Sequence, residues 1–118
     1  NVMRAGLFLL LHGIGAARKR FAGFNHKDIH NENIMWIKNF KDETIVVNMD
    51  DQKVRVHAPF IPKLIDFEMS SFGKQESSTD ILDLFFCFNT YYAEKDEKDD
   101  FLHFTNSDAG LLGAAWDS

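Results

Sequence analysis

Two long apolar segments and several short ones set the pattern of this chain. Residues 2–17 carry apolar side chains on nearly all sides, which predicts a helix at the centre of its domain. Residues 80–92 (DILDLFFCFNTYY) predict a second apolar helix, with Thr79 or Asp80 as its N-cap. The apolar runs between them are short. The order of helix, short strands and helix predicts an α+β fold.

Four short apolar runs between the two helices predict strands. The first is IMWI at residues 34–37. Residues 44–49 and 53–57 alternate apolar and polar positions and are rich in β-branched side chains, which predicts a hairpin. The last strand is expected at residues 63–67 (KLIDF), after two prolines that interrupt the hydrogen-bonded ladder. We therefore expect two apolar helices flanking short β-hairpins.

Composition and charge narrow the class of protein. The 118 residues are 45% hydrophobic and 26% charged, which predicts one folded domain. Thirteen Lys and Arg against eighteen Asp and Glu give a net charge of −5, whereas nucleic-acid-binding modules usually present a basic face, so no nucleic-acid partner is expected.

One apolar run and one cysteine bear on where the protein works. The only candidate membrane segment, residues 5–17, is too short for a bilayer, which takes about 20 apolar residues, so no membrane partner is expected. The single cysteine, Cys87, excludes an internal disulfide and is expected to be a small buried hydrophobe. Its lack of a partner indicates an intracellular protein, in the cytoplasm or nucleus.

Two polar clusters sit at the ends of predicted strands. The first is HKDIHNEN at residues 26–33, directly before IMWI, and the second is LIDFE at residues 64–68, where an acid directly ends the strand. A hairpin between them would bring the clusters side by side. Asp28, Asn33 and Asp66 supply oxygen ligands of the kind that Mg²⁺ takes together with phosphate oxygens. A further free carboxylate is what a hydroxyl nucleophile needs as its proton acceptor.

These residues resemble a known family. HKDIHNENIM is similar to the protein-kinase catalytic loop H-R-D-x-K-x-x-N-(I/V)-(L/M), and KLIDFE is similar to the strand and D-F-G that follow it. TDILDL, at residues 79–84, resembles the start of the family's central buried helix. The closest resemblance is to haspin-like kinases and kinase-like proteins of large DNA viruses. They share a His after the catalytic Asp, a long insert before the metal-binding Asp, and a residue other than Gly after D-F.

The resemblance covers about residues 2–92 and implies a kinase-like C-terminal lobe. Residues 1–118 would form a partial protein-kinase-like domain, because the chain starts at the helix before the catalytic loop and has no initiator Met. An N-terminal lobe in the same chain would then be a partner of this part. Alone, these residues are expected to be inactive.

The resemblance implies catalytic and cofactor-binding roles for four residues. Asp28 would accept or orient the proton of the substrate hydroxyl. His30 stands where the family usually has Lys and would contact the transferred phosphate, with a charge that depends on pH. Asn33 and Asp66 would hold the Mg²⁺ ions that bridge the phosphates of ATP.

Three further residues would support the site, and two depart from the family's pattern. His26 would pack on Phe67 and hold the loop, and Asp80 would accept hydrogen bonds from the backbone amides of the loop. Lys27 replaces the usual Arg and loses its bidentate fork. Glu68 replaces the Gly of D-F-G and adds a negative charge beside a proposed Mg²⁺ ligand.

Three functions remain open. The first is ATP-dependent phosphoryl transfer to Ser/Thr hydroxyls of a protein substrate, as part of a larger kinase domain. The second is a small-molecule phosphotransferase of the aminoglycoside or choline kinase type. The third is a pseudokinase or interaction module, which Glu68 favours. Two simpler interpretations also stay open: Asp28 and Asp66 as ordinary turn acids, and the H-x-D-x-H pattern of His26 to His30 as a transition-metal site.

Overall fold

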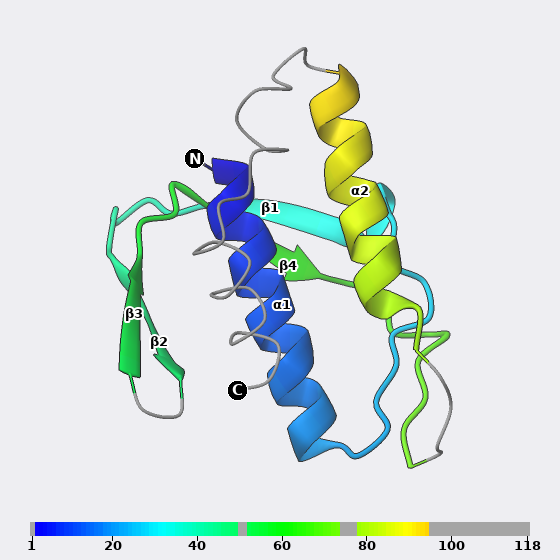
Figure 1. Cartoon of the computed structure of the whole chain (residues 1–118). Coiled ribbons are helices and arrows are strands. Elements are labelled where there is room, and N and C mark those ends of the chain that lie inside the picture. Colours follow the sequence, from blue (N-terminus) through cyan, green and yellow to red (C-terminus); the bar gives the residue numbers. More distant parts are fainter. Residues whose placement is uncertain (1, 50–51, 74–77, 95–118) are drawn as a thin grey trace.

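The computed structural model describes residues 2–49, 52–73 and 78–94, the last range without the side chains of 89–94 (Figure 1). Two helices and two small antiparallel sheets make an α+β fold, as the sequence predicts. The elements in chain order are α1 (Val2–Arg20), the 3-10 helix η1 (Asn31–Asn33), β1 (Ile34–Lys38), β2 (Ile45–Met49), β3 (Gln52–Val56), β4 (Phe60–Leu64) and α2 (Asp80–Glu94).

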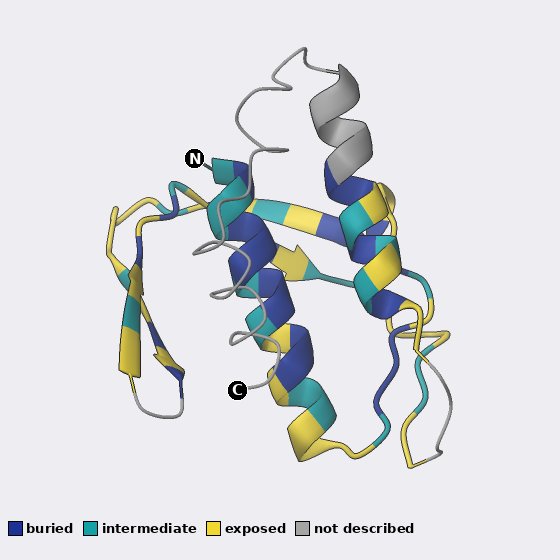
Figure 2. Ribbon diagram, viewed as in Figure 1, coloured by how far each residue is buried: buried dark blue, intermediate teal, exposed yellow. Residues whose placement is uncertain are grey.

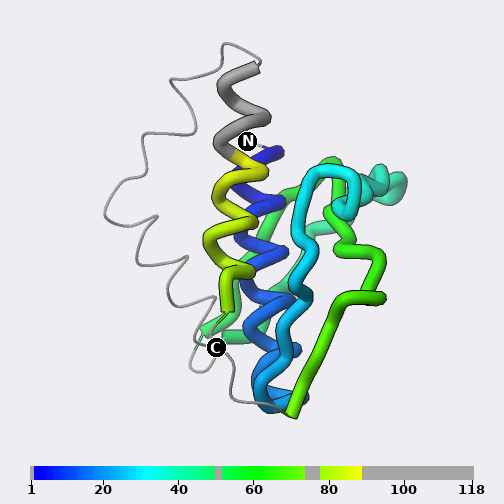
Figure 3. Tube along the Cα trace, turned by 90° about the vertical axis from the view of Figure 1, so that its right-hand side faces the viewer, coloured from blue at the N-terminus to red at the C-terminus, as the bar shows by residue number. Residues whose placement is uncertain are grey.

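The helices and the β1–β4 sheet form two layers. Figures 1 and 3 show α1 and α2 side by side on one face of the sheet. The β2–β3 hairpin stands on the other side of α1 from α2 (Figure 1). No helix in the described part of the chain is long and apolar enough to cross a membrane.

Helix α1 is buried along much of its length because it contributes to two hydrophobic clusters (Figure 2). Leu7 and Leu11 pack in the larger cluster with Leu84 and Phe88 of α2. Phe8 points to the other side and packs with the hairpin residues of the smaller cluster, Val47, Met49, Val56 and Ala58. These two contacts explain why the sequence is apolar on nearly all sides of this helix. The helix continues to Arg20, three residues beyond the predicted end, through a basic last turn that suits the negative end of the helix dipole.

The strands confirm one hairpin and correct the last predicted strand. β2 and β3 pair as expected, from Ile45 opposite Val56 to the turn. β4, however, ends at Leu64 and not at residue 67, and it runs through Pro62 instead of starting after it. A two-stranded sheet leaves each strand one free edge, where a residue without an N–H is tolerated. β4 pairs with β1, and the β2–β3 hairpin is inserted between these two strands in the sequence. The chain therefore does not form one hairpin after another.

A glycine lets α1 approach the β1–β4 sheet closely. A Cβ at Gly6 would lie 2.5 Å from Cη2 and 2.7 Å from Cζ3 of Trp36. The Trp36 ring has little freedom to yield, because it packs edge-on against Phe88 with ring centroids 6.2 Å apart. Gly13, two turns further along, has open space where its Cβ would be.

We therefore expect opposite effects of the same substitution at these two glycines. Gly6→Ala should lower the free energy of unfolding by about 1–3 kcal/mol, because the methyl group overpacks against Trp36. Gly13→Ala should raise it by about 0.5–1 kcal/mol through helix propensity alone. Urea denaturation followed by tryptophan fluorescence measures both. A Gly6→Ala variant as stable as Gly13→Ala would contradict the close packing.

Candidate active site

Strand pairing and loop hydrogen bonds bring the two polar clusters together. Just beyond the last pair of the β1–β4 sheet, the amide of Ile65 donates to the carbonyl of Asn33 at 2.9 Å. At the other end of the clusters, Asn25 and Ser71 form an isolated antiparallel bridge with N–O distances of 2.9 and 3.0 Å. The clusters therefore lie side by side, as expected, and the pairing of β1 with β4 places them there.

Asp80, the first residue of α2, holds the start of the first cluster. Its carboxylate is 1% exposed and accepts hydrogen bonds from the amides of His26 at 2.7 Å and Lys27 at 3.1 Å. This is the contact that the family resemblance implied. Lys27 has a φ of 71°, in the left-handed region that non-glycine residues rarely adopt. The two bonds to Asp80 hold the backbone at this unfavourable point.

The His26 ring connects the two clusters. It is fully buried, and its Nδ1 accepts from the amide of Asp28 at 3.1 Å. Its Nε2 lies 2.9 Å from the carbonyl of Ile65, which can only accept, so Nε2 carries the proton. The ring also packs edge-on against Phe67 at 5.1 Å, the second contact that the resemblance implied. One imidazole thereby fixes the backbone of both clusters.

Asp28, His30 and Asn33 form a compact polar group. Asn33 donates through Nδ2 to the carbonyl of Asp28 at 2.8 Å and to its carboxylate Oδ2 at 3.1 Å. His30 Nε2 lies 3.4 Å from the other carboxylate oxygen, Oδ1, and 3.1 Å from Asn33 Nδ2. The side chain of Asp28 remains 39% exposed. Its carboxylate is therefore held in place and still open to a substrate.

Asp66 follows β4 by two residues and lies beside this group without joining it. The backbone at Ile65 is bonded to Asn33, but the Asp66 side chain accepts only from the amide of Glu68, at 3.3 Å, among the described residues. Asp66 has a φ of 58° and an exposed side chain. Of the four residues expected to act on substrate or cofactor, three are in contact and the fourth is their neighbour through the backbone.

The donor atoms bear on which metal the site suits. Among the described residues, no group of three or more His, Cys, Asp or Glu side chains could hold a metal ion. Both ring nitrogens of His26 are engaged with the backbone, so the H-x-D-x-H pattern does not act as a transition-metal site through this residue. The polar contacts of the Asn33 side chain with described residues are all made by Nδ2. Its Oδ1 accepts no hydrogen bond from these residues and is an oxygen of the kind that Mg²⁺ takes.

A second anchor of the first cluster, at the end of α1, has no signal in the sequence pattern. Arg18 donates to the carbonyl of Phe24 at 2.7 Å and to the side-chain oxygen of Asn25 at 2.9 Å. Asn25 is 2% exposed and forms the bridge to Ser71. Asn25 stands directly before the polar first cluster, so its place in the sequence carries no signal of burial.

Cys87 on α2 contacts the backbone of the first cluster through its thiol. Its thiol is buried, as expected, and lies 3.8 Å from the carbonyl of Ile29, to which it donates. Burial raises the pKa of Cys87 above its usual value, and the negative charge of Asp83 raises it further. The sulfur therefore remains a protonated donor and not a reactive thiolate.

We expect the Asp80 carboxylate to stabilise the fold. Asp80→Asn leaves the side chain one acceptor oxygen for two buried amides, so the free energy of unfolding should fall by about 1–3 kcal/mol. The amides of His26 and Lys27 should exchange with solvent faster. Asp83→Asn, in the same first helical turn, is the matched control and should cost about 0.5 kcal/mol. Equal losses in the two variants would show that the amide bonds contribute little.

The hydrogen bonds of His26 predict its tautomer. Long-range ¹H–¹⁵N correlation spectra should show the proton of the His26 ring on Nε2 and a bare Nδ1. His12 is the control, because its ring forms no hydrogen bond or ion pair with any described residue and should sample both tautomers. A proton on Nδ1 of His26 would contradict the bond from the Asp28 amide.

No protein-family model, no curated protein and no solved structure matches this chain.

Proposed function

We propose that this chain takes part in ATP-dependent phosphoryl transfer to Ser/Thr hydroxyls of a protein substrate, as the C-terminal-lobe part of a kinase domain. The observation that carries the proposal is the Asp28 carboxylate. It is partly exposed, yet it is fixed by Asn33 and lies in a loop that Asp80 and His26 hold from two sides. Catalytic groups need this combination of access and fixed geometry.

Asp28 would accept or orient the proton of the attacking hydroxyl. Its Oδ2 receives a hydrogen bond from Asn33, while Oδ1 faces His30 at 3.4 Å. A substrate hydroxyl that approaches Oδ1 would meet a partly exposed carboxylate whose Oδ2 is bonded to Asn33 and whose Oδ1 has His30 on one side. His30, beside that oxygen, is in position to contact the phosphoryl group.

Asn33 and Asp66 are the residues that would hold Mg²⁺. The Oδ1 atom of Asn33 and the Oδ2 atom of Asp66 accept no hydrogen bond from the described residues. Two protein oxygens suit Mg²⁺, which fills its remaining positions with water and phosphate oxygens. When bound with ATP, the ion neutralises charge on the phosphates.

Backbone strain at both clusters supports a functional interpretation. Three non-glycine residues among those described have positive φ, and two of them, Lys27 and Asp66, lie in the two clusters. The third, Asp42, lies beside a surface turn, where its amide donates to Asn39. Strained residues persist where surrounding contacts hold them, and they gather at sites of function. A pair of ordinary turn acids would not need a buried Asp80 and a buried His26 to support them.

The test of this function is the effect of Asp28→Asn on phosphate transfer from Mg-ATP. The full reading frame that encodes these residues is assayed, with any upstream residues included. We expect kcat for transfer to a histone-type protein to fall about 10²- to 10⁴-fold, the usual contribution of a catalytic acid or base. Affinity for Mg-ATP should stay within about twofold of wild type. Glu32→Gln, which removes a carboxylate from an exposed neighbouring position, is the control and should leave kcat unchanged.

Each outcome of this assay separates the candidate functions. Transfer to protein that Asp28→Asn removes supports the proposal. Transfer only to aminoglycoside- or choline-type hydroxyls would favour the small-molecule phosphotransferase. If there is no transfer and Mg-ATP does not raise the melting temperature, both enzyme assignments fail and the pseudokinase or interaction module remains.

A further inference from the structure

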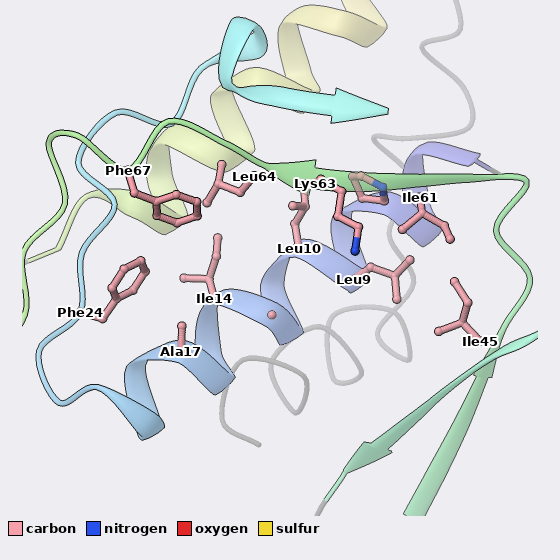
Figure 4. A pocket seen from close by; sticks show the side chains of 12 residues that line it. Leu9, Leu10, Ile14, Ala17, Phe24, Ile45, Ile61, Lys63, Leu64 and Phe67 are labelled. Atoms are coloured by element: carbon pink, nitrogen blue, oxygen red, sulfur yellow. The ribbon is translucent and has the colours of Figure 1, made fainter. Parts of the chain in front are cut away.

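An apolar groove of about 350 Å³ lies between α1 and β4 (Figure 4). Its walls come from α1, β4, the first residue of β2 and two aromatic residues of the polar clusters' loops, Phe24 and Phe67. Ile14 and Leu64 lie beside these aromatic rings, which close one end of the groove (Figure 4). The volume is at the lower end of the range for small-molecule sites, about 300–1,000 Å³.

The groove has one charged side chain. Lys63 on β4 directs its ammonium group into the space between the strand and α1 (Figure 4). It forms no ion pair or hydrogen bond through its side chain with any residue that the structure describes. All other lining residues are apolar or glycine. A ligand that matches this wall needs one negative charge and a long apolar part.

We propose that the groove binds a single-chain carboxylate amphiphile, a medium-chain fatty acid. The alkyl chain would lie along α1 between Leu9 and Ala17, a rise of about 12 Å for eight residues, with its carboxylate at Lys63. A peptide fits less well because its backbone amides need partners and the lining offers no polar side chain besides Lys63. Pro62 also deprives β4 of an N–H for pairing with an added strand.

Phe67 connects this groove to the candidate active site. It lines the groove, is 53% exposed, and packs on the buried ring of His26. A bound alkyl chain would cover part of the exposed ring and stabilise its contact with His26. The binding itself does not depend on phosphate transfer, so the two proposals can fail separately.

Gly13 allows the groove to be filled without disturbing the fold. It lines the groove, and an added Cβ meets no atom within 4 Å. Gly13→Leu should therefore place a side chain where the ligand lies. Ala16→Leu adds nearly the same bulk at an exposed position of α1 outside the groove and is the matched control. Lys63→Met removes the charge and retains an apolar stem.

The experiment titrates the full 118-residue chain with decanoate below its critical micelle concentration, by calorimetry and methyl NMR. Wild type and Ala16→Leu should bind one decanoate with shifts at Ile14 and Leu64, and Gly13→Leu should lose at least about tenfold in affinity. Lys63→Met should weaken decanoate binding about fivefold, as expected for one partly exposed ion pair. Its affinity for the uncharged 1-decanol should stay within about twofold of wild type.

Three outcomes would overturn the proposal. If decanoate does not bind saturably to the wild-type chain, the groove is not a fatty-acid site. Unchanged binding in Gly13→Leu would place it elsewhere, and unchanged decanoate binding in Lys63→Met would show that the lysine only extends its ammonium into water. Folding of each variant is checked by its melting temperature, which for Gly13→Leu should equal or exceed that of wild type.

Discussion

The hydrogen bonds from the amides of His26 and Lys27 to the Asp80 carboxylate join parts of the chain that are 54 and 53 residues apart. A buried carboxylate needs strong donors to offset its lost hydration, and buried amides equally need acceptors. Each side of the contact thus satisfies the other. Because Asp80 begins a helix whose Leu84 and Phe88 are in the main core, the loop is tied to the most firmly packed part of the molecule. The positions of Asp28 and Asn33 follow from that attachment.

Helix α1 contacts most of the other parts of the fold. It packs against α2 in one cluster and against the β2–β3 hairpin in the other, and its last turn supplies Arg18 to the segment before the loop. Gly6 sets how closely it approaches Trp36. The helix therefore positions the polar clusters indirectly, through its packing against α2 and through the hydrogen bonds of Arg18. The groove is the part of the space between α1 and β4 that side chains do not fill.

Features with a local pattern could be predicted from the sequence. Both helices and the β2–β3 hairpin follow from apolar periodicity and alternation, and the resemblance to kinase motifs singled out Asp28, Asn33 and Asp80 as candidates. The pairing of β1 with β4 could not be predicted, because it depends on partners about 26 residues apart with a hairpin between them. Pro62 was misleading, since a proline reads as a break until the strand is known to have a free edge. Arg18 and Asn25 have no periodic or motif signal, because their importance comes from hydrogen bonds that exist only in the folded chain.

The two ends of the segment that contains the β2–β3 hairpin lie next to each other. Asn39, just after β1, donates its amide to the carbonyl of Pro59, just before β4, at 2.8 Å, and thereby closes the base of the excursion. Closing a loop at its base makes its free energy depend only weakly on its length. Insertions and deletions between these two residues can therefore accumulate in evolution without moving Asn33 relative to Ile65. The hairpin must still cover Phe8. Its length should therefore vary widely among related sequences, while the residues that face Phe8 stay hydrophobic.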